Sequence, residues 1–246
     1  MSGHAYTAPA HAGQVDAGER GDPAKGRPLN ALAVAGLLAI GLVLVWTVAE
    51  LIPAVRFKDA VALHDFTTLS RPRVDSSSEF LLHLLDAPLF VLWGIALVAV
   101  AVAGERPRVA AAAAAVLALA PLSAELLKPL LAHRHDHVGG AVVGAASWPS
   151  GHTTAATALA LCAVLVAPRR LRKPAALLGL VFVSAVAAAL LVLSLHMPSD
   201  IAGGVLLASL WMALAVFALR GSERIRPSRP MANGSDSRTG SLTRPK

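Results

Sequence analysis

Long apolar runs separated by short polar segments dominate the pattern along this chain. A helix that crosses the hydrocarbon core of a bilayer needs about 20 mostly apolar residues. The pattern therefore predicts an all-α, polytopic membrane protein built as a bundle of six transmembrane helices. The predicted spans are Leu29–Pro53, Phe80–Gly104, Val109–Leu131, His152–Ala167, Pro174–Leu195 and Ile201–Leu219.

Polar segments flank the apolar domain at both ends of the chain. They contain too little apolar surface to fold by themselves, so residues 1–28 and 221–246 are predicted to be disordered tails. No apolar core follows Met1 closely, which argues against a cleavable signal peptide. The membrane domain is expected to occupy residues 29–220.

Composition supports the membrane class. Hydrophobic residues make up 55% of the chain and charged residues 15%, whereas a soluble domain carries about 25% charged residues. The mean hydropathy is +0.61. A single cysteine, Cys162, excludes an intrachain disulfide and a zinc site built from several thiolates.

The formal net charge of +7 is distributed unevenly among the polar segments. Cytoplasmic loops of membrane proteins carry most of the Lys and Arg residues. With the N-terminus in the cytoplasm, the inner segments hold 16 of the 22 Lys and Arg residues, four of them in the short loop Pro168–Pro174. This distribution predicts a plasma-membrane protein with both termini cytoplasmic, and it explains the charge without a nucleic-acid partner.

The same orientation brings two distant polar clusters, Lys128–His152 and His196–Asp200, to the outer face of the membrane. A charged residue near a span usually has a structural or functional role, because burying it in the bilayer costs about 2.5–3.5 kcal/mol on insertion scales. Lys128 alone could simply extend its amine to the interface. Together the two clusters indicate a site on the extracytoplasmic side.

The segment Trp148–Thr154 has the features of a helix start. Ser150 is a good N-cap, and Gly151 allows the backbone to approach a ligand closely. The free N–H groups of a first turn attract anions, phosphate above all, and His152 lies in that turn. An ordinary capped helix with an interfacial histidine is the simpler alternative.

His196 and Asp200 are four residues apart, which places them on one face of a helical turn. An aspartate beside a histidine orients the ring and stabilises its cation, as in activated nucleophiles. Alternatively, Asp200 could only interact favourably with the positive end of the dipole of the helix that Pro198 begins. Lysine, oriented N–H groups and two histidines on one face are together what phosphoryl transfer requires.

Three groups of residues carry a resemblance to a known family. Their order and spacing resemble the three motifs of the type 2 phosphatidic acid phosphatase superfamily, over about Phe80 to Leu219, so the catalytic core is expected at residues 80–219. The groups are Lys128 with Arg134, Pro149-Ser150-Gly151-His152, and His196-x-x-x-Asp200.

The resemblance implies a metal-independent lipid phosphatase without a cofactor, which acts on a lipid phosphate among membrane lipids. It implies that His196 is the nucleophile that forms a phosphohistidine, that Asp200 holds it, and that His152 protonates the leaving group. The residues implied in phosphate binding are Lys128, Arg134 or His135, Ser150 and Gly151. Phosphatidic acid, phosphatidylglycerol phosphate and polyprenyl phosphates all remain candidate substrates, and homo-oligomerisation stays open.

Two departures from the family pattern bear on activity. Five residues separate Lys128 from Arg134 where the family has six, so either Arg134 is displaced by one residue or His135 stands at the position of the family's arginine. Ala189 and Leu190 stand where the third motif has Ser-Arg. Losing one donor to the phosphate can cost about 10²–10³-fold in rate. A catalytically weakened or silent relative that binds phospholipid is therefore an alternative, and a lipid phosphotransferase is another.

Other polar residues have further interpretations. His133, His135, Asp136 and His137 could ligate zinc, although a cationic loop facing lipid headgroups is the favoured interpretation. Glu125 precedes Lys128 by three residues and is expected to form an ion pair with it. His83 and Asp86 are expected to pair or to line the site. The segment Arg56–Glu79 is expected to contain a short amphipathic helix on the membrane surface.

Overall fold

The computed structural model describes residues 28–132 and 143–224, and all regular structure within these ranges is helical. The predicted all-α class is therefore confirmed. Of the predicted tails, residues 1–27 and 225–246 lie outside the described residues, whereas Pro28 and residues 221–224 belong to helices. The elements are α1 (Pro28–Leu51), α2 (Pro53–Thr67), α3 (Pro72–His83), α4 (Ala87–Ala103), α5 (Pro107–Leu130), α6 (Gly151–Val166), η1 (Arg169–Leu171), α7 (Arg172–Val192) and α8 (Pro198–Arg224).

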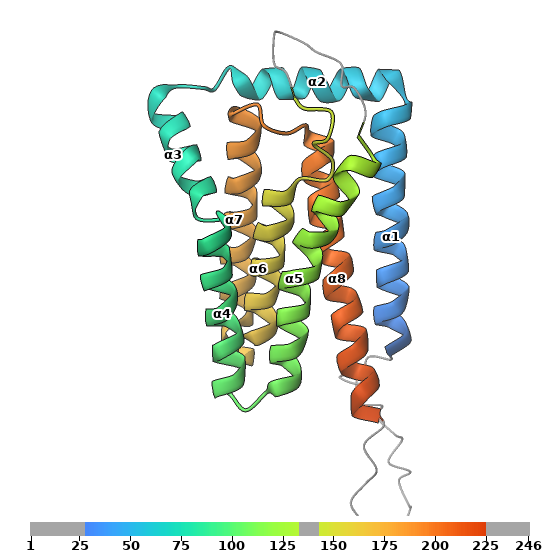
Figure 1. The fold of residues 1–246 in the computed structure, drawn as a ribbon, viewed down its shortest axis with the longest axis vertical. Coiled ribbons are helices and arrows are strands. Elements are labelled where there is room, and N and C mark those ends of the chain that lie inside the picture. The colour runs from blue at the N-terminus through green and yellow to red at the C-terminus, as the bar shows by residue number, and fades with distance from the viewer. Residues whose placement is uncertain (1–27, 133–142, 225–246) are drawn as a thin grey trace, which may run out of the picture.

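Helix α6 is the centre of the bundle. It packs against α4, α5, α7 and α8, while α1 packs against the outside of α8. Helix α2 runs across one end of the bundle, and α3 leads from α2 down beside α7 to the start of α4 (Figure 1). The two segments with the predicted histidines, at the starts of α6 and α8, both lie at the end that α2 crosses (Figure 1).

Four helices in the described part of the chain are long and apolar enough to cross a membrane: Asn30–Leu51, Pro107–Leu130, Arg169–Val192 and Pro198–Gly221. A fifth span results if α3 and α4 count as one broken span. Helix α6, the fourth predicted span, has only 16 residues. The predicted number of six spans thus remains a prediction, although a helix lies at each predicted position.

The predicted second span, Phe80–Gly104, is interrupted. Helix α3 ends at His83, α4 begins at Ala87, and the two axes differ by 55°. Pro88 explains the break, because it has no N–H to donate and its ring would clash with the carbonyl of residue 84 in a continuous helix. His83 Nδ1 and Asp86 Oδ2 lie 2.9 Å apart across the break, which confirms that these residues pair.

Small residues let the helices approach closely. Ala113, Ala120, Ala156 and Ala158 have no exposed surface, and small side chains are the usual contacts between helices in a bilayer. At the end of the bundle away from α2, Arg106 donates hydrogen bonds to the carbonyls of Val166 (2.8 Å) and Leu165 (3.2 Å). A cation at these carbonyls suits the negative end of the α6 dipole.

Helix α2 is packed onto the end of α7 and the start of α8. Ala60 and Leu63 are buried in one cluster with Leu191 and Met197, whereas Phe57 points outward and is 57% exposed. A helix is therefore present in the segment where one was expected, and its expected position on the membrane surface stays a prediction. The buried face places α2 directly beside the segment that contains His196.

Candidate active site

The position of His196 is set by how α7 ends. Ser194 adopts a left-handed conformation with φ of 57°, and the Leu195 N–H donates to the carbonyl of Leu190 at 2.9 Å. This hydrogen bond closes the C-terminus of a helix and turns the chain sharply. His196 follows directly, and Pro198 then begins α8, where its fixed φ suits a first helical turn.

Asp200 holds His196 in place. Its carboxylate Oδ2 accepts a hydrogen bond from the Met197 N–H at 2.9 Å and lies 3.3 Å from His196 Nδ1. The Asp200 side chain is fully buried and that of His196 is 11% exposed. The predicted pairing is confirmed, and an Nδ1–H directed at Asp200 leaves the Nε2 lone pair for another group.

Ser150 caps α6 as predicted. Its hydroxyl oxygen accepts hydrogen bonds from the Thr153 N–H (3.3 Å) and the Thr153 hydroxyl (3.1 Å). The Thr154 hydroxyl donates to the Ser150 carbonyl at 2.7 Å. Ser150 is fully buried, and its side chain caps the N-terminus of α6. The first-turn N–H groups of Gly151 and His152 have no acceptor among the described residues.

A backbone hydrogen bond joins the two histidine segments. The Ser150 N–H donates to the carbonyl of Asp200 at 3.0 Å, so the starts of α6 and α8 touch. Gly204 makes this possible, since a methyl group there would lie 2.7 Å from the Ser150 carbonyl oxygen. At Gly203 it would lie 2.7 Å from the Trp148 ring nitrogen. The glycine pair is a signal in the sequence that the motif analysis did not use.

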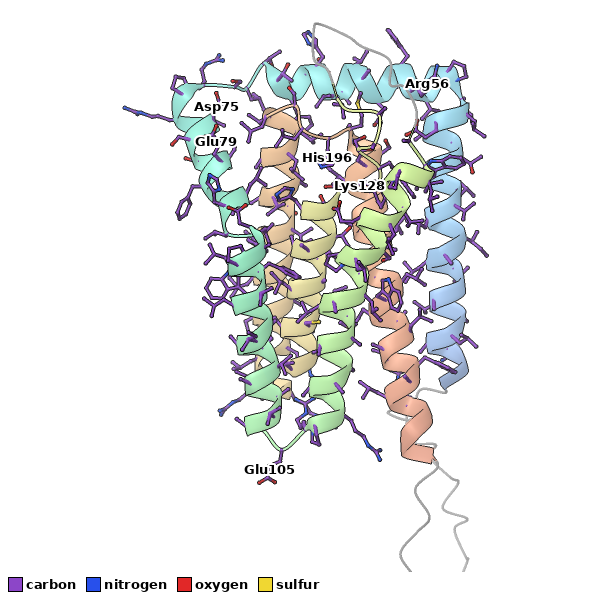
Figure 2. All side chains as sticks on the ribbon, in the orientation of Figure 1. Arg56, Asp75, Glu79, Glu105, Lys128 and His196 are labelled. Carbon is purple, nitrogen blue, oxygen red and sulfur yellow. The ribbon has the colours of Figure 1, made fainter. Side chains whose placement is uncertain are left out.

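A cavity of about 280 Å³ opens between α4, α5 and the start of α6. Its polar lining consists of Glu125, Lys128, Gly151 and His152, and apolar residues such as Phe90 form the rest. Lys128 Nζ donates to Glu125 Oε1 at 2.6 Å, which confirms the predicted ion pair. His196 and Lys128 both act electrostatically on His152, and Figure 2 shows Lys128 and His196 at the same end of the bundle, with Glu105 at the other.

Some predicted residues cannot be placed in this site. Arg134 and His135 lie outside the described residues, as does the histidine cluster that was considered for zinc, His133 to His137. In the described ranges, no group of three or more His, Cys, Asp or Glu residues could hold a metal ion. Ala189 and Leu190 are buried in the apolar core below the site, so neither side chain supplies a polar contact.

Asp59 was missed in the sequence. Its Oδ2 accepts a hydrogen bond from the Ser199 hydroxyl at 2.6 Å, and its Oδ1 accepts one from the Ser199 N–H at 3.2 Å. Burial raises the pKa of the Asp59 carboxyl above its ordinary 3.8, and the two hydrogen bonds from Ser199 partly oppose that rise. The bond spans 140 residues, and no local pattern predicts it. Asp59 thereby ties α2 to Ser199, the residue directly before Asp200.

The fold resembles the crystal structure of a transmembrane PAP2-type phosphatidylglycerolphosphate phosphatase from Bacillus subtilis, with a TM-score of 0.63 and 19% sequence identity. The match covers 79% of this chain and 98% of that one. No curated protein sequence matches this chain.

The apolar helices and this structural likeness define an integral membrane protein of the helical-bundle class. The sequence model of the PAP2 superfamily matches residues 108–224, which contain Lys128, the α6 start and the His196–Asp200 pair. This segment of the chain is therefore assigned by its sequence to the PAP2 superfamily.

Proposed function

We propose that the protein is a lipid phosphate phosphatase that works through a phosphohistidine at the outer face of the membrane. The observation that carries this proposal is the buried His196–Asp200 pair, joined by a backbone hydrogen bond to the helix start that holds His152. The match of residues 108–224 to the PAP2 superfamily supports it. The Bacillus subtilis protein of similar fold is a phosphatidylglycerolphosphate phosphatase, and a lipid phosphate of this kind is the proposed substrate class.

In the proposed reaction, His196 Nε2 attacks phosphorus while the bond from phosphorus to the lipid oxygen breaks. His152 gives its proton to the departing alkoxide, since a positioned histidine can act as an acid near neutral pH. Water then attacks the phosphohistidine and returns a proton to His152, and the P–N bond breaks to release inorganic phosphate. Asp200 stabilises the positive charge that His196 develops.

The start of α6 and Lys128 supply the proposed phosphate contacts. The Gly151 amide and the positive end of the α6 dipole attract an anion, and Lys128 adds a full charge in the same cavity. Ser150 contributes by holding this helix start through its cap. Arg134 or His135 would complete the set. The reaction as proposed needs neither a metal ion nor a cofactor.

The proposed topology has six spans, with α3 and α4 as one broken span and α6 as a short one. Both termini are cytoplasmic, the tails predicted at 1–28 and 221–246 begin beyond the helix ends at Pro28 and Arg224, and the catalytic core covers residues 80–219 of a domain at 29–220. The surplus of Lys and Arg in the inner segments supports this orientation in the plasma membrane.

A weakened or silent relative is the second candidate, and the burial of Leu190 favours it. The family's arginine would stand at this position, but Leu190 is fully buried in the apolar core. A lipid phosphotransferase would use the same phosphohistidine and differ only in the acceptor. Adding a second lipid alcohol to the assay separates it from a hydrolase, because a new phospholipid would then form.

The test is phosphate release from lipid phosphates by the purified protein in detergent with EDTA present, beside His196→Ala. We expect release by the wild type, loss of at least about 10³-fold in the variant, and acid-labile phosphate on the wild type alone. Equal unfolding midpoints and gel-filtration profiles would show that the variant is folded. No release above the variant from phosphatidic acid, phosphatidylglycerol phosphate or a polyprenyl phosphate would overturn the hydrolase proposal.

A further inference from the structure

An acidic residue lines the same cavity as the groups that suit phosphate. Glu125 and Lys128 project from the last two turns of α5 and meet Gly151 and His152 across the cavity. Lys128 Nζ donates to Glu125 Oε1 at 2.6 Å. The Glu125 side chain is 61% exposed, whereas that of Lys128 is 22% exposed.

The carboxylate lies directly against the start of α6. A methyl group added to Gly151 would be 2.7 Å from Glu125 Oε1 and 3.4 Å from Lys128 Nζ. A helix start and an ammonium group attract any small oxyanion, carboxylate or phosphate alike. Glu125 therefore occupies the position in which a phosphoryl group would meet Lys128 and Gly151.

We propose that Glu125 is a resident competitor for the phosphate site, which the substrate must displace from Lys128; the inference rests on the proposed phosphatase function. The displaced side chain turns toward solvent, a movement that its exposure allows, while the more buried Lys128 stays. Glu125 thus weakens the binding of every phosphate-bearing ligand and of the phosphate product, and favours product release.

The alternative is that Glu125 only positions Lys128. The two roles predict opposite effects of Glu125→Gln, in which an amide oxygen still accepts from Lys128 but the negative charge is gone. A competitor that loses its charge makes phosphate bind more tightly. A positioning residue that loses its charge makes phosphate bind equally or less well, because Lys128 is held less firmly.

The experiment uses the full chain in detergent and two readouts. For Glu125→Gln we expect KM for the lipid phosphate, and the inhibition constant of inorganic phosphate, to fall about fivefold, the size of one exposed ion pair. We expect kcat to change less than about twofold, because the charge acts on binding rather than on the chemical step. Glu79→Gln is the matched control, since Glu79 is an exposed glutamate on α3 that does not line the cavity and lies away from Lys128 (Figure 2).

Binding of inorganic phosphate, followed by the shift of the unfolding midpoint, separates this proposal from the phosphatase proposal because it needs no turnover. Tighter binding by Glu125→Gln than by wild type, lost in the Glu125→Gln, Lys128→Ala double variant, supports the competitor even if no lipid is hydrolysed. Unchanged or weaker binding by Glu125→Gln, or no phosphate-induced shift in any variant, overturns it.

Discussion

The carboxylate of Asp200 meets His196 Nδ1 and the Met197 N–H, while its backbone carbonyl accepts from the Ser150 N–H. One fully buried residue thus connects the proposed nucleophile, its own helix start and the start of α6. A buried carboxylate is stable only with such partners. The orientation of His196 therefore depends on backbone contacts as well as on the side-chain pair.

Asp59 extends this arrangement to α2 and gives a pH-dependent prediction. Burial favours its neutral form, so its pKa in the folded protein lies above the ordinary 3.8. The contribution to stability is therefore fully present below pH 3.8 and is lost as the pH rises through the folded-state pKa. Asp59→Asn mimics the neutral acid, with an amide oxygen for the Ser199 N–H and an NH₂ for its hydroxyl.

We accordingly expect the unfolding midpoint of Asp59→Asn, measured relative to wild type, to rise as the pH increases from about 4 to 7. Asp65→Asn, on the same helix but without a hydrogen bond to α8, is the matched control. A midpoint difference that is constant over this pH range would show that burial of Asp59 carries no such cost.

At the scale of elements, the contact between α6 and α8 has a clear weak point at Gly204. A methyl group at Gly204 would lie 2.7 Å from the Ser150 carbonyl oxygen and 3.0 Å from Thr153 Cβ. Because one of these neighbours is backbone, it cannot yield without moving the helix start. Gly204→Ala should destabilise the protein by about 1–3 kcal/mol, as overpacking does, and lower activity by separating His152 from His196.

Gly221→Ala is the control within the same helix. No atom lies within 4 Å of a methyl group at Gly221, and alanine is the better helix former by up to about 1 kcal/mol. We expect unchanged or slightly raised stability and unchanged activity for this variant. Thermal unfolding and phosphate release measure both, and equal behaviour of the two variants would contradict a close α6–α8 contact.

The local parts of the site could be predicted, since they follow from helix geometry over a few residues. The Ser150 cap, the His196–Asp200 pair and the Glu125–Lys128 pair all have this character. The Asp59–Ser199 bond could not, because it depends on where α2 packs. Pro88 was a signal in the sequence for the helix break, but the long apolar run around it favoured one continuous span.

At the scale of the whole molecule, the proposed catalytic residues that the structure describes lie at one end of the bundle. Helix α2 crosses that end, while the Arg106 and Arg169–Lys173 segments lie at the other (Figure 1). The approximate positions of the long apolar helices followed from hydropathy, whereas those of α2 and α3 did not. The number of membrane spans could not be predicted in this way. Helix α6 is only 16 residues long and is largely surrounded by other helices, and neither hydropathy nor length describes such surroundings.

The orientation in the membrane can be tested with single engineered cysteines. The native Cys162 is fully buried in α6 and should not react with a polar reagent. Ser77 on α3 and Arg170 in η1 are both exposed, and they lie toward opposite ends of the bundle. Ser77→Cys and Arg170→Cys therefore report on the two sides without removal of the native thiol.

The excess of Lys and Arg in the inner segments predicts that Ser77 faces outward and Arg170 faces the cytoplasm. In intact cells, a membrane-impermeant maleimide should label Ser77→Cys, and it should label Arg170→Cys only after the membrane is opened. The wild type should stay unlabelled throughout, as the control for Cys162. The reverse labelling would place the His196 end in the cytoplasm, and the substrate would then have to come from the inner leaflet.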